Sequence, residues 1–441
     1  MILNESCLNV KVGSLALEDG ISIIDADAKY FNRVIGHFIS TKLYFIMKQS
    51  VKHLGVTESF KQIIDEFGIP QGETPAGFRV EFELCANGVC RADLKRDISY
   101  DKNGVKRPTK FLFSADSANP YEVMEIKNTI ANLTCNPAII YNLFINNPKA
   151  NIGGKFQTRD EVMSEIGRIL GPGIDISVEL NDPFNSTQEQ ILEECDHFAK
   201  MLSKHRVVIK VPHTGPINSE NISELLSGDK RFHRRWNAGS TADRMRGHNL
   251  AIMLKEHGYR VNFTLMFEPF QTAMALQASP YFINSFIMFR EQQTKYLSGL
   301  MNAYESTGEL GFVNSMREFM LANDYLGANE AEIDGLSVLK EAENILRNRL
   351  ADPANDGLDA IRHNLRALRR TNLPDTRLIV CNFQDERLYP QIDRLIMEDE
   401  FLDMADKIVI TNPPELMSAF TSSPLVVQFQ RRFMNAVNNG K

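Results

Sequence analysis

The strongest constraint on the fold is an alternation of short apolar runs and helices that begins at Lys110. The apolar runs are Phe111–Ala115, Ile174–Leu180, Val207–Val211, Val261–Met266, Tyr281–Ile287, Leu378–Phe383 and Ile408–Thr411. The helices expected between them include Pro120–Ile130, Glu189–Lys204 and Ala242–His257. This alternation predicts a parallel sheet, wound either as a barrel or as an open sheet.

Two observations favour the barrel. No Gly-x-Gly-x-x-Gly or Walker loop follows any of the runs, which weakens the case for a nucleotide-binding open sheet. Polar residues gather at the carboxyl ends of the runs, the side on which (β/α)8 barrels carry their active sites. We therefore expect an α/β fold: a (β/α)8 TIM barrel with an N-terminal α+β extension and long βα-loop insertions.

The 441 residues divide into three expected parts. Residues 1–110 read as an accessory extension, because they lack the alternation of the following chain. The barrel is expected over 111–420, with insertions at 215–239 and 291–375 that exceed what a βα repeat needs. Residues 421–441 remain as a C-terminal tail. The segment 291–375 is also compatible with a homodimer interface.

Within the extension, apolar residues spaced over 31–39 indicate one helix, and Glu58–Phe67 indicates another. Phe78–Leu84 alternates strictly and leads into Asn87-Gly88, which predicts a β-hairpin. This hairpin would bring Cys85 and Cys90 opposite each other, and we expect both to be reduced thiols.

The composition excludes several classes of protein. A hydrophobic share of 43% and a charged share of 24% are those of an ordinary soluble globular protein. Forty-nine basic and 56 acidic residues leave a net charge of −7, so neither nucleic acid nor an anionic membrane is an expected partner. The six cysteines are dispersed without metal-ligand spacing. No signal peptide or bilayer-length apolar stretch is evident, so the expected location is the cytoplasm.

Lys210 interrupts the apolar stretch Val207–Thr214. An ammonium group inside a strand that is buried on both faces is costly unless it is paired or loses its proton. A lysine desolvated in this way can be a neutral amine near pH 7 that attacks a carbonyl and forms a Schiff base. The alternative is a lysine at a strand end that reaches solvent or pairs with a carboxylate.

Other expected strands also carry polar residues at or near their ends: carboxylates, amides and a hydroxyl. They are Asp116, Asn136, Glu179, Asn262 and Thr264. Each alone is commonly a helix cap, a loop brace or an ordinary strand residue. The convergence of two carboxylates, two amides and one hydroxyl upon a single lysine is what indicates a catalytic site.

These residues lie in motifs that resemble the successive strand motifs of the transaldolase family. The motifs are Ala115-Asp116, Thr134-Cys135-Asn136-Pro137, Val178-Glu179, Ile209-Lys210-Val211-Pro212, Val261-Asn262-Phe263-Thr264-Leu265 and the stretch Ile408–Leu416. Their order and approximate spacing agree with the family, and the resemblance covers roughly residues 111–420.

The resemblance implies a (β/α)8 barrel that works without a metal or an organic cofactor and moves a dihydroxyacetone unit between sugar phosphates. Lys210 would be the Schiff-base nucleophile. Glu179 would act as general acid and base through a water held with Thr264. Asp116 would take and return the proton of the C4 hydroxyl as the C3–C4 bond breaks and forms.

The substrate-binding residues that the resemblance implies are Asn136, Asn262, Asn284, Gln384 and Arg290. Asn136 and Asn262 would hold donor hydroxyls and fix the intermediate. The chain departs from the family where a phosphate is expected: Asn284 replaces a serine and Phe289 an arginine, although Arg290 is adjacent. At the seventh strand, Ser-Phe-Arg becomes Asn382-Phe383-Gln384. Both phosphate-binding arginines are therefore missing from their usual places.

Three explanations follow from this departure. The substrate lacks a phosphate, or other arginines bind the anion, or the barrel has lost turnover of sugar phosphates. The candidates for relocated bases are Arg290, Arg387 and the loop residues Arg231, Arg234 and Arg235. For the loop residues, a solvated surface is the competing interpretation.

The leading functional hypothesis is a transaldolase-like enzyme that transfers a ketol unit through Lys210, with altered substrate recognition. A class I aldolase, or another lysine-imine enzyme of a specialised pathway, is the second hypothesis. A non-catalytic barrel that acts as a sensor or scaffold is the third. The expected partner is a small carbonyl or sugar substrate.

Overall fold

The computed structural model describes residues 9–68, 77–101, 105–349, 358–381 and 386–439. The chain forms two compact units. The first consists of Met1–Thr109 with the short segments Gly167–Ile176 and Leu202–Arg206, and the second of the remaining residues. Across the described ranges, none of the helices combines the length and apolarity needed to cross a bilayer.

The first unit contains two small sheets. One has the strand order β2 (Ser22–Ile23), β4 (His53–Val56), β6 (Val89–Arg96) and β5 (Phe78–Leu84), and in the other β1 (Asn9–Lys11) pairs with β3 (Phe38–Ser40). The helices are α1 (Gly13–Leu17), α2 (Ala28–Phe31), α3 (Thr41–Ser50) and α4 (Glu58–Phe67). Phe31, Leu54 and Phe60 are fully buried in the core between them.

Two expectations for this unit were wrong. The helix expected over 31–39 ends at Phe31, because a turn that includes Gly36 separates it from Phe38 and Ile39, which lie in β3. In the hairpin of β5 and β6, Leu84 rather than Cys85 is the partner of Cys90. Cys85 and Cys90 are both free thiols.

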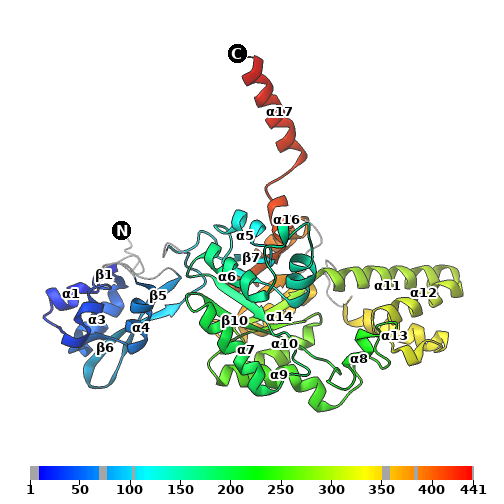
Figure 1. Cartoon of the computed structure of the whole chain (residues 1–441), viewed down its shortest axis with the longest axis horizontal. Helices are drawn as coiled ribbons and strands as arrows, with labels where there is room; N and C mark the ends of the chain where they lie inside the picture. The colour runs from blue at the N-terminus through cyan, green and yellow to red at the C-terminus, as the bar shows by residue number, and fades with distance from the viewer. Residues whose placement is uncertain (1–8, 69–76, 102–104, 350–357, 382–385, 440–441) are drawn as a thin grey trace. The chain divides into compact units, whose positions relative to one another are not determined.

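The second unit contains a closed barrel of eight strands (Figure 1). In barrel order the strands are β7 (Leu112–Asp116), β8 (Asn132–Thr134), β9 (Asp175–Glu179), β10 (Arg206–Pro212), β11 (Arg260–Thr264), β12 (Phe282–Phe286), β13 (Arg377–Cys381) and β14 (Ile408–Asn412). All the strand pairings described within the barrel are parallel. The (β/α)8 barrel expected from the alternation of runs and helices is therefore confirmed.

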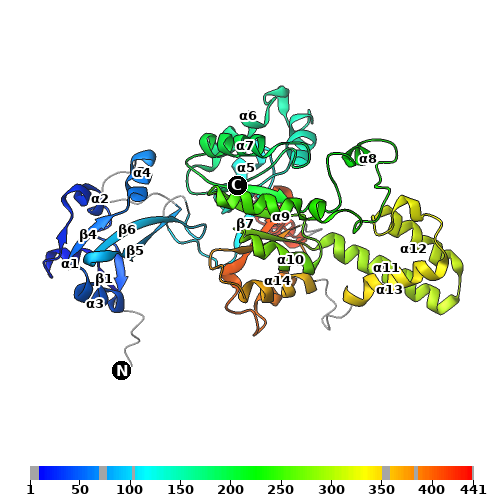
Figure 2. The same ribbon diagram turned by 90° about the horizontal axis from the view of Figure 1, so that it is seen from below.

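Helices surround the barrel, and Figure 2 labels α9, α10 and α14 among them. Apolar side chains of these helices pack in the core against the outward faces of the strands. The surrounding helices are α5 (Pro120–Ile126), the π-helical segment η4 (Ala138–Ile145), α6 (Arg159–Leu170), α7 (Gln188–Met201), α9 (Thr241–Glu256), α10 (Pro269–Ala275), α14 (Asp359–Arg369), α15 (Leu388–Ile396) and α16 (Pro414–Ala419). Ile209, Phe263 and Val380 are buried against these helices. Burial of both strand faces explains why the strands read as apolar runs rather than as alternating ones.

Two segments lengthen βα loops of the barrel. The loop after β10 contains the short helix α8 (Ile222–Leu226). After β12, the helices α11 (Met288–Thr307), α12 (Leu310–Ala322) and α13 (Gly335–Arg349) lie side by side and enclose a small core of their own, which includes Leu297, Met316 and Val338. Helix α14 instead packs on α10 and the barrel core. The last helix is α17 (Pro424–Asn439).

Candidate active site

Lys210 lies in β10 with its side chain inside the barrel. Only 6% of the residue is exposed to solvent. Its Nζ lies 3.2 Å from Oε2 of Glu179 at the end of β9, and it donates a hydrogen bond of 3.2 Å to the carbonyl of Cys135, which follows β8. Three neighbouring strand ends therefore hold one buried ammonium group, the arrangement expected when parallel strands end at a common rim.

The charge state of Lys210 differs from the neutral amine that desolvation alone would favour. Burial lowers the pKa of Lys210, but the nearby carboxylates of Glu179 and Asp116 raise it by more, so the net pKa lies above its ordinary value of 10.5. Lys210 in the free protein is therefore an ammonium ion. To act as a nucleophile, Lys210 would have to give a proton to a neighbouring base, and Glu179 is within reach.

Asp116 is the last residue of β7 and is electrostatically coupled to Lys210 and Glu179. Its Oδ1 is shielded from solvent and has no hydrogen-bond partner among the described residues. Burial raises the pKa of Asp116, Lys210 lowers it, and Glu179 raises it, with a net increase above 3.8. A shielded carboxylate oxygen without a partner costs stability, and groups of this kind are concentrated at functional sites.

The raised pKa of Asp116 makes a prediction about stability. Because the folded protein ionises Asp116 less readily than the unfolded chain does, the stability from this group is complete below about pH 3.8 and is lost as the pH rises through the raised folded-state pKa. Asp116→Asn removes the ionisable carboxyl group, so the variant does not lose this stability as the pH rises. We expect urea unfolding to give the variant a larger free energy of unfolding than the parent at pH 8, with a smaller difference at pH 5. A variant that is less stable than the parent at pH 8 would contradict this electrostatic description.

A chain of polar side chains crosses the barrel interior beside the lysine. Asn284 Nδ2 donates to Asn262 Oδ1 at 2.6 Å, and Asn262 Nδ2 donates to Ser177 Oγ at 3.3 Å. Ser177 Oγ donates to Asn132 Oδ1 at 3.3 Å, and Asn132 Nδ2 donates to Ser114 Oγ at 2.7 Å. Asn262 is the register partner of Lys210. The network therefore fixes the orientation of the amide beside the lysine.

Sequence reasoning singled out Asn262 and Asn284 but missed Ser114, Asn132 and Ser177. The signal was a small polar residue inside an otherwise apolar strand, as at Ser177 in β9. Each of these three residues is fully buried, so each needs a hydrogen-bond partner.

Thr264 and Asn136 occupy different positions relative to the lysine. Thr264 is buried on the same face of β11 as Asn262, two residues further toward the carboxyl end of the strand. Asn136 follows β8 and is half-buried, and its Oδ1 accepts a hydrogen bond from the backbone N–H of Ile139. The side chain of Asn136 therefore caps the start of η4. Gln384 lies outside the described residues.

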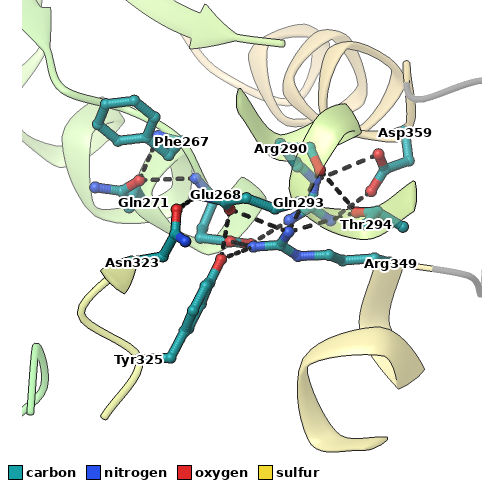
Figure 3. Close-up of polar contacts among 10 residues, drawn as sticks. All are labelled: Phe267, Glu268, Gln271, Arg290, Gln293, Thr294, Asn323, Tyr325, Arg349 and Asp359. Carbon is teal, nitrogen blue, oxygen red and sulfur yellow. Dashed lines mark hydrogen bonds and ion pairs between the residues drawn. The ribbon is translucent and has the colours of Figure 1, made fainter. Parts of the chain in front are cut away.

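Arg290 is not available as a phosphate ligand. Only 3% of it is exposed, and its guanidinium pairs with Glu268 and, at 2.6 Å, with Asp359 (Figure 3). Arg349 of α13 pairs with Glu268 at 2.5 Å and also bonds the hydroxyl of Tyr325. We therefore withdraw Arg290 from the expected substrate-binding residues. It joins the start of α11 to α10 and α14.

One of the loop arginines, Arg235, is also held in ion pairs. Arg235 pairs with Glu330 at 2.7 Å and with Glu341 at 3.1 Å, so it ties the loop after β10 to the α11–α13 insertion. An anion clamp that uses Arg235 would first have to break both ion pairs.

Among the residues that the structure describes, no group of three or more His, Cys, Asp and Glu side chains is arranged to hold a metal ion.

Comparison with known families agrees with this geometry. The sequence model of the transaldolase/fructose-6-phosphate aldolase family matches residues 113–438. The chain belongs to this family. The resemblance noted from the strand motifs is thereby confirmed, and the protein is an enzyme of the aldolase and transaldolase type.

Structural comparison finds a distant neighbour. A sialic acid aldolase of Ruminococcus gnavus matches 54% of this chain and 98% of its own, with 12% sequence identity and a TM-score of 0.25. No curated protein sequence matches the chain.

Proposed function

We propose that this family member transfers a dihydroxyacetone-type ketol unit through a Schiff base on Lys210. We also propose that its substrates either lack a phosphate or are bound by groups other than the two missing arginines. One observation carries the proposal: the buried Lys210 Nζ lies 3.2 Å from the carboxylate of Glu179, with the shielded carboxylate of Asp116 coupled to both. A nucleophile, a proton acceptor beside it and a second carboxylate are the groups that imine-based C–C cleavage requires.

The steps follow from these groups. Lys210 passes a proton to Glu179, and the resulting amine attacks the ketone carbonyl to form a carbinolamine. Glu179 returns the proton to the departing hydroxyl, water leaves, and the imine forms. Asp116 then takes the proton of the substrate hydroxyl next to the scissile bond. The C–C bond breaks, an aldehyde leaves, and the bonding electron pair moves into the protonated imine, which becomes a neutral enamine attached to Lys210. A second aldehyde reverses these steps and receives the ketol unit.

A class I aldolase is the second candidate, and it is favoured by the family itself, whose description includes fructose-6-phosphate aldolase beside transaldolase. The two reactions use the same lysine and differ in the fate of the enamine. Water hydrolyses the intermediate in an aldolase and frees the donor ketone. In a transferase, the intermediate waits for a second aldehyde.

A product assay separates the two candidates. The protein is incubated with a ketose donor alone, and with the donor and an acceptor aldehyde, and both free dihydroxyacetone and the new ketose are measured. A transferase gives the new ketose only with both substrates and almost no free dihydroxyacetone. Release of dihydroxyacetone from the donor alone would replace the transferase with the aldolase. Lys210→Met is the control for both arms.

A further inference from the structure

Three phenylalanine rings meet at the carboxyl ends of β11 and β12. Phe286 is the last residue of β12 and, two residues after Asn284, shares the inward face of that strand. The ring centroid of Phe267, which follows β11, lies 4.7 Å from that of Phe286 and 6.4 Å from that of Phe289. We name these three residues the aromatic mouth. It lies at the same end of the barrel as the site residues that end or follow β7, β8 and β9.

The loop that carries Phe267 is held by hydrogen bonds, and the three rings are reachable from solvent. Gln271 Oε1 accepts hydrogen bonds from the backbone N–H groups of Phe267 and Glu268 at 2.7 and 2.8 Å, which holds the loop after β11 (Figure 3). Phe267 and Phe286 are half-buried, and 45% of Phe289 is exposed. An accessible apolar surface beside polar site residues is suited to binding a ligand.

A cavity adjoins Phe289 of the aromatic mouth. Phe289 also lines a cavity of about 530 Å³ between α11 and α12. Tyr296 and Phe319 line the same cavity, with their ring centroids 4.8 Å apart. Phe289 therefore belongs both to the aromatic mouth and to the lining of this cavity, where Tyr296 and Phe319 add apolar surface beside the polar side chains of Gln292, Gln293 and Glu318.

The cations nearest to this mouth in the chain are already neutralised. Arg290 follows Phe289 directly, yet it is bound by Glu268 and Asp359. Arg349 is bound by Glu268 in the same network (Figure 3). A phosphate placed against the phenylalanines would lose part of its hydration, and neither Arg290 nor Arg349 could bind it without breaking its present ion pairs, which is unfavourable.

We propose that the aromatic mouth is the specificity subsite of the reaction and that it selects an acceptor aldehyde with an uncharged, apolar substituent. This inference rests on the proposed Lys210 chemistry for its role in turnover, but the binding of the substituent is independent of that chemistry. Burial of apolar surface against Phe286 and Phe289 supplies the binding energy that a phosphate–arginine contact would otherwise supply.

The kinetic test uses the ketose donor that is active in the product assay and three acceptors: phenylacetaldehyde, glyceraldehyde 3-phosphate and the small glycolaldehyde. We expect the parent to favour phenylacetaldehyde over glyceraldehyde 3-phosphate in kcat/KM by about tenfold or more. Phe286→Ala and Phe289→Ala should each lower kcat/KM for phenylacetaldehyde by about tenfold more than for glycolaldehyde. Phe270→Ala is the matched control, because Phe270 is an exposed ring of α10 that stacks on Trp236.

A binding test keeps the subsite separate from turnover. Ligand-observed NMR measures 2-phenylethanol and glycerol 3-phosphate against the parent, Phe289→Ala and Lys210→Met. Binding of 2-phenylethanol that survives Lys210→Met and weakens in Phe289→Ala supports the subsite, whether or not the protein forms a Schiff base. Preferential binding of glycerol 3-phosphate, or equal binding of 2-phenylethanol by the parent and Phe289→Ala, would overturn it.

Discussion

Lys210→Met is expected to reduce turnover by at least about 10⁴-fold, because the reaction loses its covalent route and with it most of an acceleration that is typically 10⁶ or more. Methionine keeps the length and apolar body of the side chain, so the barrel interior remains filled. It removes the amine that lies 3.2 Å from Glu179. The measurement is steady-state kcat with the best donor and acceptor pair.

The exposed Lys200 on α7 provides the matched control. Lys200→Met changes the same functional group far from the barrel interior and should retain the turnover of the parent. Turnover in a folded Lys210→Met variant within about tenfold of the parent would rule out a Schiff base on this residue. Circular dichroism of both variants shows whether they are folded.

Glu179→Gln is expected to lower kcat by about 10²- to 10⁴-fold, the usual contribution of general acid–base catalysis. Glutamine occupies the same space but cannot accept the proton that Lys210 must release. The same substitution removes a carboxylate that raises the pKa of Lys210. The residual activity should therefore rise with pH at lower values than in the parent, since deprotonation of Lys210 becomes easier.

This shift of the pH profile separates catalysis from a structural role. A residue that only supports the fold would lower kcat without moving the pH dependence assigned to Lys210. Glu194→Gln is the matched control, because Glu194 pairs with Arg159 at 2.7 Å and not with the lysine. If Glu179→Gln and Glu194→Gln lowered kcat equally and left both pH profiles unchanged, Glu179 would have no role as the base.

The barrel could be predicted because its strands are buried on both faces and its helices are regular. The apolar run at β10 and the helix ended by Gly258 are visible in the sequence alone. Strand β8 was not among the predicted runs, since it spans only Asn132–Thr134 and two of its three residues are polar. Asn132 finds its hydrogen-bond partners inside the barrel, in Ser114 of β7 and Ser177 of β9, and a local pattern does not reveal them.

Helix ends show the limit of local patterns. Ser186 and Glu189 have the sequence spacing of a capping box at the start of α7, but the reciprocal hydrogen bonds join Thr187 and Gln190, one residue further along. Both pairs satisfy the same spacing rule. Only the backbone geometry selects between them.

The sequence placed Asp116, Glu179 and Lys210 on separate strands that the structure brings together, but it did not predict the electrostatics of this group. The position of Lys210 in an apolar strand suggested a neutral amine, yet Glu179 lies close enough to keep it charged. Arg290 read as a free base near the substrate, while its partners Glu268 and Asp359 lie 22 and 69 residues away in the chain. Contacts at such separations are set by tertiary packing, so a local sequence motif does not predict them.

Borohydride trapping tests the Schiff base on Lys210 most directly. The parent and Lys210→Met are reduced in the presence of fructose 6-phosphate, dihydroxyacetone or unphosphorylated ketoses, and the intact mass of each protein is measured. We predict a stable adduct on the parent, none on Lys210→Met, and more complete trapping by the unphosphorylated donors. A folded parent protein that gives no adduct with any of these donors would contradict Schiff-base chemistry at this site.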